Sequence, residues 1–357
     1  MPTAANTAAF PNSVQQHALS IATFAEELLR FFDDLSLGLD NDIRGDGLKP
    51  IRDGLVSLIT RVTNPLVTYI RNDITPLVEA LEMPAPIPSI RPPTVPKYTA
   101  VQHPSIVSLN ILIPVYARAL TGFTTSVLSH ATLANLLISV LWKGIVAISH
   151  RQDAKPSPMI TPDASPLLTA KRRRGSPTAI TPPVTPPASR FILKLPPSRP
   201  PSPPATACAT SAVADCRSLY DLLVLLPRPS RDHDSTRLAC EAVDEAFEGL
   251  RTLPSLLDGV KGLPPSATDL NKLTTEIPTL IALAVLLRAY GGPGASSIPV
   301  LLALSEEEYR KGCLSGFARA EECAVVVVNR VMDCLFRDAQ AHGPVLQWMR
   351  LELEEIQ

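Results

Sequence analysis

The sequence predicts an all-α protein whose helical bundles are interrupted by a long, disordered, proline-rich basic linker. Apolar residues make up 45% of the 357 residues, enough for a sizeable core, whereas aromatic residues make up only 5%. Ala, Leu and Val dominate the apolar fraction, which favours packed helices over a β-sandwich. The 37 prolines are twice the usual fraction of about 5%, and they concentrate in one block.

Charge and proline content divide the chain into three parts. Residues 1–150 carry 10 Lys and Arg against 11 Asp and Glu. Residues 151–215 carry 9 against 3, a net charge of +6, and residues 216–357 carry 14 against 20, a net charge of −6. The basic block also holds 15 prolines and has no periodic apolar pattern, as is typical of disordered or polyproline II segments. We therefore expect a disordered linker over residues 150–215.

The part before the linker is expected to contain four segments. These are a flexible N-terminus (1–12), a helical region (13–82), a proline-rich connection (83–104) and an apolar helical segment (105–149). Apolar residues at helical spacing predict a first helix over 13–35. Its expected apolar face consists of Ala18, Ile21, Phe24, Leu28, Leu29 and Phe32.

An eleven-residue period runs through the next helical stretch. The segments GLVSLI, PLVTYI and PLVEAL begin at Gly54, Pro65 and Pro76, which places their Leu-Val pairs along one side of a slightly underwound helix. This pattern resembles the lipid-surface repeats of apolipoproteins and perilipins, which also place prolines at repeat boundaries, and the resemblance implies lipid association. The charges within the repeats sum to −1, whereas helices on anionic membranes are rich in Lys and Arg. We therefore favour a proline-kinked helix packed on neighbouring helices, with lipid association as the alternative.

Residues 105–149 are the most apolar part of the chain, with Arg118 and Lys143 as their only charged side chains. A membrane-spanning helix needs about 20 predominantly apolar residues. The best window, SVLSHATLANLLISVLW, contains several polar residues and is followed directly by Lys143. We expect a buried amphipathic helix here, with a membrane span or hairpin as the alternative. We expect His130 at the edge of the core or on the surface rather than as a ligand.

Residues 216–357 are predicted to form a bundle of four to five helices. The GGPG segment at Gly291 ends one of them. Ser305 and Glu308 match the capping box of a long final helix that we expect to continue to about Asp338. The AVVVV run at Ala324 favours a strand by propensity, but its flanks are helical and we expect it in a helix core.

The cysteines and the N-terminal residues indicate the compartment. The six cysteines include no C-x-x-C pair, and the first residues lack the charged and apolar regions of a signal peptide. We expect a reducing compartment, the nucleus and/or the cytoplasm, with free thiols as core residues. Cys313, Cys323 and Cys334 are spaced to lie along one face of the last long helix.

Motifs for catalysis are absent from the sequence. It contains no G-x-G-x-x-G, G-x-x-x-x-G-K-[ST], G-x-S-x-G or H-E-x-x-H pattern. The RDHDS segment around His233 suggests a metal ligand only weakly, because three adjacent residues cannot all converge on one ion. We expect no catalytic residue, cofactor or metal, and an unrecognised helical enzyme is the third reading. No zinc-finger spacing, homeodomain-type helix or RNP motif occurs, so no specific nucleic-acid partner is expected.

The linker holds all candidate functional residues. Proline follows seven hydroxyl residues, as proline-directed kinases require. A run of four cations resembles a short nuclear localisation signal read by an importin. One apolar cluster could dock on a protein partner. The candidate phosphosites are Ser157, Thr161, Ser165, Ser176, Thr181, Thr185 and Ser202. The candidate nuclear signal is Lys171, Arg172, Arg173 and Arg174, and the candidate docking motif is Arg190, Phe191, Ile192, Leu193, Lys194 and Leu195.

Phosphorylation would reverse the sign of the linker charge. Seven phosphates would add about −10 to −14 at neutral pH to a segment that starts at +6. The unmodified basic linker is attracted to the acidic C-terminal part, and the phosphorylated linker would be repelled by it. We therefore expect a non-enzymatic adaptor or regulatory protein controlled by multisite phosphorylation. The alternative is a peripheral membrane or lipid-droplet-associated helical protein.

Overall fold

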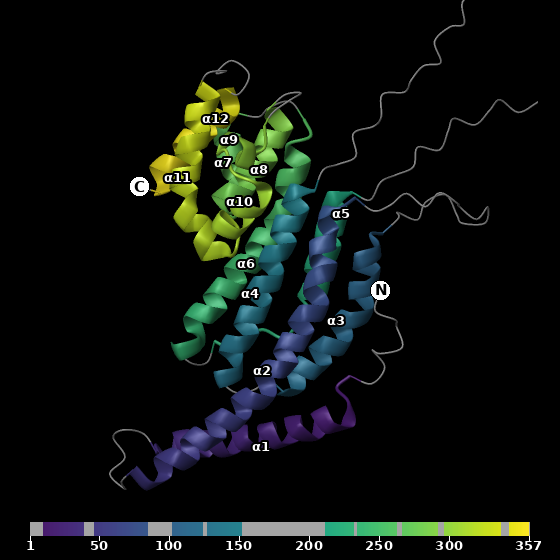
Figure 1. The fold of residues 1–357 in the computed structure, drawn as a ribbon, viewed down its shortest axis with the longest axis vertical. Coiled ribbons are helices and arrows are strands. Elements are labelled where there is room, and N and C mark those ends of the chain that lie inside the picture. Colours follow the sequence, from purple (N-terminus) through teal and green to yellow (C-terminus); the bar gives the residue numbers. More distant parts are fainter. Residues whose placement is uncertain are drawn as a thin grey trace, which may run out of the picture. The chain divides into compact units, whose positions relative to one another are not determined.

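The computed structural model confirms the all-α class for the residues that it describes, because every regular element among them is helical (Figure 1). These residues are 10–38, 46–84, 102–123, 127–151, 211–231, 234–262, 266–291, 296–336 and 343–356. The helices are α1 (Ser13–Asp34), η2 (Asp46–Leu48), α2 (Lys49–Glu79), η3 (Ala80–Glu82), α3 (Pro104–Phe123), α4 (Val127–His150), α5 (Ala212–Leu223), α6 (Asp234–Gly259), α7 (Ala267–Thr274), α8 (Thr279–Tyr290), α9 (Ile298–Leu301), α10 (Glu306–Cys313), α11 (Phe317–Leu335) and α12 (Gly343–Ile356).

Helix α1 forms where the sequence predicts it, but it buries a different face. Its N-terminus is fixed by a capping box in which Asn12 and Gln15 exchange side-chain and backbone hydrogen bonds. The predicted apolar face is only partly correct: Leu29 is buried, but Ile21 and Phe24 are 44% and 61% exposed. The face packed on α2 instead carries Leu19, Ala22, Ala25 and Leu29, because the small alanines allow the two helices to approach closely.

Helix α2 carries the eleven-residue repeat and buries its stripe inside the protein. The last apolar residue of each repeat, Ile59, Ile70 and Leu81, is at most 1% exposed. Pro65 and Pro76 lie within the helix on its exposed side, where a proline costs a hydrogen bond but does not collide with packed neighbours. Of the Leu-Val pairs themselves, Leu66, Val67 and Val78 are buried, and Leu55, Val56 and Leu77 are half-buried. The repeat therefore packs on neighbouring helices, as the packing interpretation predicts.

The apolar segment 105–149 consists of two helices, α3 and α4, and both are long and apolar enough to cross a membrane by length and composition. In α4 the protein itself buries 61% of the most apolar window, and in α3 it buries 44%. Helix α4 contacts α2, α5, α6 and α8. His130 is 7% exposed, which is deeper than the predicted position at the core edge or on the surface. Helix α4 is thus the central core helix of the described chain.

The C-terminal part differs from the prediction at three places. Helix α5 begins at Ala212, inside the predicted linker, because Ala212 and Val213 are buried in the core. Eight helices, α5 to α12, occur among the described residues of this part rather than four to five. The predicted long helix is broken between Cys313 and Phe317, although its capping box at Ser305 is confirmed. The end of α8 before Gly291 is also confirmed.

The described helices before and after the linker form one compact unit, which lies within residues 1–153 and 209–357. Helix α4 lies against α6 and α8, and α3 lies against α5. A continuous hydrophobic core runs through both parts, from Leu19 to Leu353. The sequence left open whether these parts share one body, and the core shows that they do.

Candidate functional site

All candidate functional residues of the linker, from Ser157 to Ser202, lie outside the described residues, as does His233. The structure does describe the two ends of that segment, Arg151 at the end of α4 and Ser211 before α5. A cluster of charged and polar residues occupies the first of these ends. We call it the polar junction, and its members are Glu82, Ser149, His150, Arg151, Asp215, Arg288, Glu306 and Arg310.

The innermost pair of the polar junction joins the two ends of the linker. Arg151 Nη1 donates to Asp215 Oδ2 at 2.5 Å, and the two side chains are 1% and 2% exposed. Moving a single charge out of water costs several kcal/mol unless a partner compensates it. The pair therefore holds the residue after α4 against the first turn of α5, on opposite sides of the basic block.

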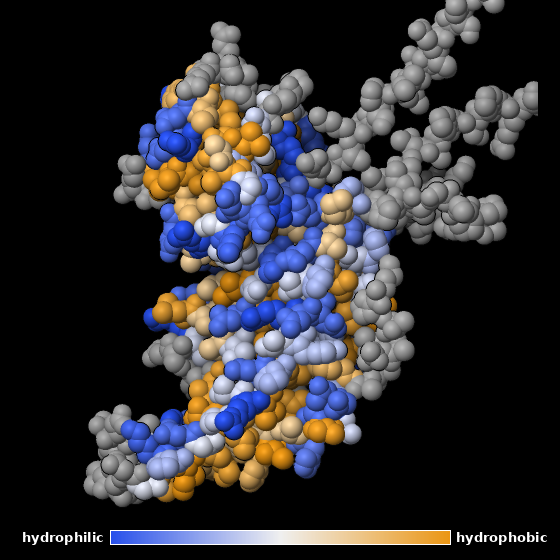
Figure 2. All heavy atoms as spheres, in the orientation of Figure 1, coloured by the Kyte–Doolittle hydropathy of each residue, from blue (hydrophilic) through white to orange (hydrophobic). Residues whose placement is uncertain are grey.

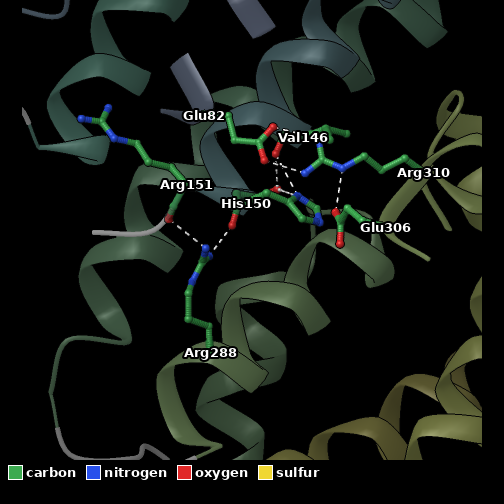
Figure 3. Close-up of polar contacts among 8 residues, drawn as sticks. Glu82, Val146, His150, Arg151, Arg288, Glu306 and Arg310 are labelled. Atoms are coloured by element: carbon green, nitrogen blue, oxygen red, sulfur yellow. Dashed lines mark hydrogen bonds and ion pairs between the residues drawn. The ribbon is translucent and has the colours of Figure 1, made fainter. Parts of the chain in front are cut away.

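Arg288 closes the carboxyl end of α4 (Figure 3). Its guanidinium, near the end of α8, donates to the backbone carbonyls of Arg151, at 2.8 Å, and of Ser149. The last carbonyls of a helix have no partner within that helix, and a cation there also complements the negative end of the helix dipole. Arg288 thus ties α8 to the last described residues before the linker, Ser149 and Arg151.

A second ion-pair group joins η3 to α10. Arg310 donates two hydrogen bonds to the Glu82 carboxylate, at 2.7 and 2.6 Å, and one to Glu306 at 2.7 Å. The hydrogen bond from Arg310 holds the pKa of Glu82 below its ordinary value, and Glu82 in turn raises the pKa of Arg310. The paired, bidentate geometry makes this contact stronger than an ordinary surface ion pair.

His150 lies between these two groups and favours its neutral form (Figure 3). Its Nδ1 lies 2.9 Å from the carbonyl oxygen of Val146 and 3.0 Å from Ser149 Oγ. Burial lowers the pKa of His150, and the positive charge of Arg310 lowers it further. A second proton on this ring would be poorly solvated and would face the Arg310 guanidinium. The carboxylates of Glu82 and Glu306 act in the opposite direction but do not outweigh burial.

Acidification is therefore expected to destabilise the protein through His150. Because the folded-state pKa lies below the ordinary value of 6.5, the contribution of His150 is complete above that pH and is lost as the pH falls toward the folded pKa. The variant His150→Asn keeps an amide donor for Val146 but removes the titration. Urea unfolding at pH 7, 6 and 5 should show a smaller loss of stability for the variant. An equal loss in both proteins would contradict this assignment.

The polar junction acts as a clamp in this geometry. Its carboxylates are engaged by arginines, its arginines by carboxylates or helix-terminal carbonyls, and its histidine by a backbone carbonyl. It contains no cysteine, and its one hydroxyl, on Ser149, donates to the carbonyl of Val146 at 2.9 Å. Five elements, η3, α4, α5, α8 and α10, are held together at the base of the linker.

A pocket of about 330 Å³ lies beside α6, and its polar lining residues bond to one another or to the backbone. Arg228 and Arg231 both pair with Asp244, which neutralises much of their charge, and Arg228 also lies 4.0 Å from the ring centroid of Phe247. The thiol of Cys240 donates to backbone carbonyls of the preceding turn. The lining residues are Arg228, Pro229, Arg231, Cys240, Val243 and Asp244.

The cysteines of the described chain are free thiols, and three of them, Cys216, Cys240 and Cys313, are buried. Burial raises the pKa of Cys216, and it raises that of Cys313 to about 11, so both stay protonated at neutral pH. The prediction that Cys313 shares one helix with Cys323 and Cys334 is wrong, because Cys313 ends α10 and the others lie on α11. Among the described residues, no group of three or more His, Cys, Asp or Glu could hold a metal ion.

No protein-family model, curated protein or solved structure matches this chain. Function is therefore proposed from the residues of the chain itself. Sequence reasoning missed the polar junction, since its members span residues 82 to 310. One signal was available: Arg151 and Asp215 stand at the two borders of the basic, proline-rich block.

Proposed function

We propose that the protein is a non-enzymatic adaptor or regulatory protein, acting in the nucleus and/or cytoplasm, whose interactions are set by proline-directed phosphorylation of residues 150–215. The observation that carries this proposal is the buried Arg151–Asp215 pair at the two ends of that block. Because the folded body holds both ends, a large change of charge between them need not disturb the core. The composition of the block, with its many prolines, favours a disordered segment that a kinase can reach.

The charges of the chain suggest how phosphorylation would act. The unmodified block carries +6 and the chain from residue 216 onward carries −6. Seven phosphates would add about −10 to −14, which would turn attraction between the two into repulsion. Phosphate on Ser176 would also mask the adjacent cations 171–174 from an importin. Phosphorylation would thereby change how accessible the apolar segment 190–195 is to a protein partner.

A variant in which all seven candidate hydroxyls are replaced by Ala tests the proposal. It should lose phosphate-dependent changes of partner and of location, whereas its thermal unfolding should match that of the unmodified protein because the core is untouched. Affinity purification with mass spectrometry, phosphosite mapping and imaging give the readouts. The matched control replaces hydroxyls of the same segment that no proline follows: Thr169, Thr178, Ser189, Ser198, Thr206 and Thr210. If the seven-Ala variant kept its partners and location under active kinase, the proposal would be wrong.

The length and hydropathy of α3 support a second candidate, a peripheral membrane or lipid-droplet-associated protein. Only 44% of its most apolar window is buried, and Val107 and Ile111 are 47% and 56% exposed. Flotation with liposomes separates the two candidates. The adaptor stays at the bottom of the gradient, and the membrane protein rises with the vesicles.

A further inference from the structure

Helix α1 presents a second line of apolar side chains that nothing in the described chain covers. Val14, Phe24 and Phe31 are 77%, 61% and 64% exposed, Ile21 is 44% exposed, and Leu35, directly after the helix, is 59% exposed. Apolar side chains lie over α1 at the lower edge of the view in Figure 2. With exposed His17 and half-buried Leu28 the line occupies positions 14, 17, 21, 24, 28, 31 and 35.

That spacing is the pattern of a coiled-coil seam. The intervals alternate strictly between three and four residues, as the a and d positions of a heptad do. The face that α1 packs on α2, through Leu19, Ala22 and Leu29, is a separate one. Helix α1 therefore has two apolar faces, of which the protein uses one.

The hairpin formed by α1 and the first half of α2 is also too thin to bury its own apolar surface. Its core is a small cluster of Ala25, Leu29 and Ile59, separate from the main core. Near the same end, Ile51 in the first turn of α2 is 53% exposed. Two helices alone cannot enclose a core, whereas four helices in antiparallel pairs can.

We infer that the exposed seam of α1 binds the same seam of a second copy of this chain, antiparallel and about a two-fold axis, so that two hairpins complete a four-helix bundle. Such an interface is self-complementary and closed, as in most homodimers.

The charges of α1 favour a second copy in this orientation. The helix has no acidic residue in its first turn and no basic residue in its last. Asp34 instead lies at its C-terminal end, where an acid is unfavourable for its own helix dipole. Against an antiparallel copy, Asp34 comes beside the N-terminus of the other α1, where an acid is favourable. A parallel copy would bring the two acidic ends together.

The same charges disfavour a lipid surface as the occupant. Helix α1 carries four acids, Glu26, Glu27, Asp33 and Asp34, against one arginine, Arg30. Helices that bind anionic membranes carry Lys and Arg on their polar face. An acidic helix with an exposed heptad seam is better matched by another helix than by phospholipid headgroups.

The seam also defines a register. Pairing each a position with a d position of the antiparallel copy sets Ile21 against Phe24, Val14 against Phe31, and Leu28 against His17. The polar His17 then meets an apolar residue instead of another histidine. The hairpin face is about 33 Å long and about 20 Å wide, roughly 660 Å² on each copy, which is near the lower end of stable interfaces.

Sedimentation equilibrium of the full chain tests the inference. The protein should show twice its chain mass of 38.4 kDa at about 100 µM, a concentration at which even a dimer with a dissociation constant of about 1 µM is almost fully formed. The variant Phe24→Glu/Phe31→Glu should show the mass of one chain. Both side chains are exposed, so the variant should keep the circular dichroism and unfolding cooperativity of the parent. The control Val326→Glu, at a residue 70% exposed on α11, should remain dimeric.

Three results would overturn the inference. The first is a single-chain mass for the unmodified protein over the whole concentration range. The second is a dimer that the double Glu substitution leaves intact. The third is a monomer that floats with phosphatidylcholine–phosphatidylserine vesicles and loses flotation in the Glu variant, which would assign the seam to lipid.

Cross-linking provides a readout that does not depend on the stability of the Glu variant. In Val14→Cys/Phe31→Cys the two new thiols of one chain lie about 26 Å apart along α1, beyond the reach of a short bismaleimide. A cross-linked 14–31 peptide pair, identified by mass spectrometry, therefore comes from two chains in the antiparallel register. Cross-linked 14–14 and 31–31 pairs without 14–31 would overturn the antiparallel arrangement.

Discussion

Replacing Asp215 by Ala is expected to lower the free energy of unfolding by about 3–5 kcal/mol. The substitution removes the carboxylate that pairs with Arg151 and leaves the guanidinium in a site where its side chain is 1% exposed. Arg288 of α8 donates to the backbone carbonyl of Arg151. A displaced Arg151 would therefore also weaken the contact between α8 and the end of α4. Urea denaturation followed by circular dichroism gives the size of the effect.

Two control variants show how much of the lost unfolding free energy comes from leaving the buried Arg151 charge unpaired and how much from losing an ion pair as such. Arg151→Met/Asp215→Leu removes both charges and keeps apolar volume, so it should recover most of the lost stability. Asp258→Ala removes a carboxylate that pairs with Arg217 on the surface, where the side chains are 64% and 46% exposed, and should cost about 0–1 kcal/mol. A loss below about 1 kcal/mol for Asp215→Ala would show that this pair does not clamp the linker ends.

Trp142→Ala is expected to cost about 3–5 kcal/mol, because it empties a large core position. Trp142 is 2% exposed on α4, its ring centroid lies 4.5 Å from that of Phe317, and its Nε1 donates to the carbonyl of Leu314 at 2.7 Å. These contacts join the part of the chain before the linker to the part after it. Since both parts share one core, the variant should still unfold in a single transition, at lower urea.

The variant Trp142→Phe isolates the hydrogen bond within that total. It keeps a ring against Phe317 but leaves the Leu314 carbonyl without its indole donor, which should cost about 1–3 kcal/mol. Circular dichroism and tryptophan fluorescence should report coincident transitions in the parent protein. Two separate transitions, with only the first shifted in Trp142→Ala, would contradict a shared core.

Local sequence rules account for much of the fold. The helix over α1, the capping box at Ser305 and the end of α8 before Gly291 follow from residues within a few positions of one another. The buried stripe of α2 follows from its eleven-residue period. The AVVVV run lies in α11, as its helical flanks predict, and a buried helix face overrides its strand propensity.

Long-range contacts account for what the sequence did not reveal. The break after Cys313 frees the carbonyl of Leu314, which is satisfied by Trp142, 172 residues earlier in the chain. The face that α1 buries depends on the small alanines that let α2 approach, not on the larger Ile21 and Phe24. The polar junction depends on side chains from five elements, and periodicity carries no information about which charges will meet.

The clamp at the base of the linker has a consequence for how this chain can change over evolutionary time. The entropic cost of closing a loop rises only with the logarithm of its length, about 0.6 kcal/mol for each doubling. With Arg151 and Asp215 fixed to each other, insertions and deletions in the intervening residues leave the geometry of the body unaltered. The number and order of the proposed phosphorylation sites between these two residues could therefore change almost independently of folding.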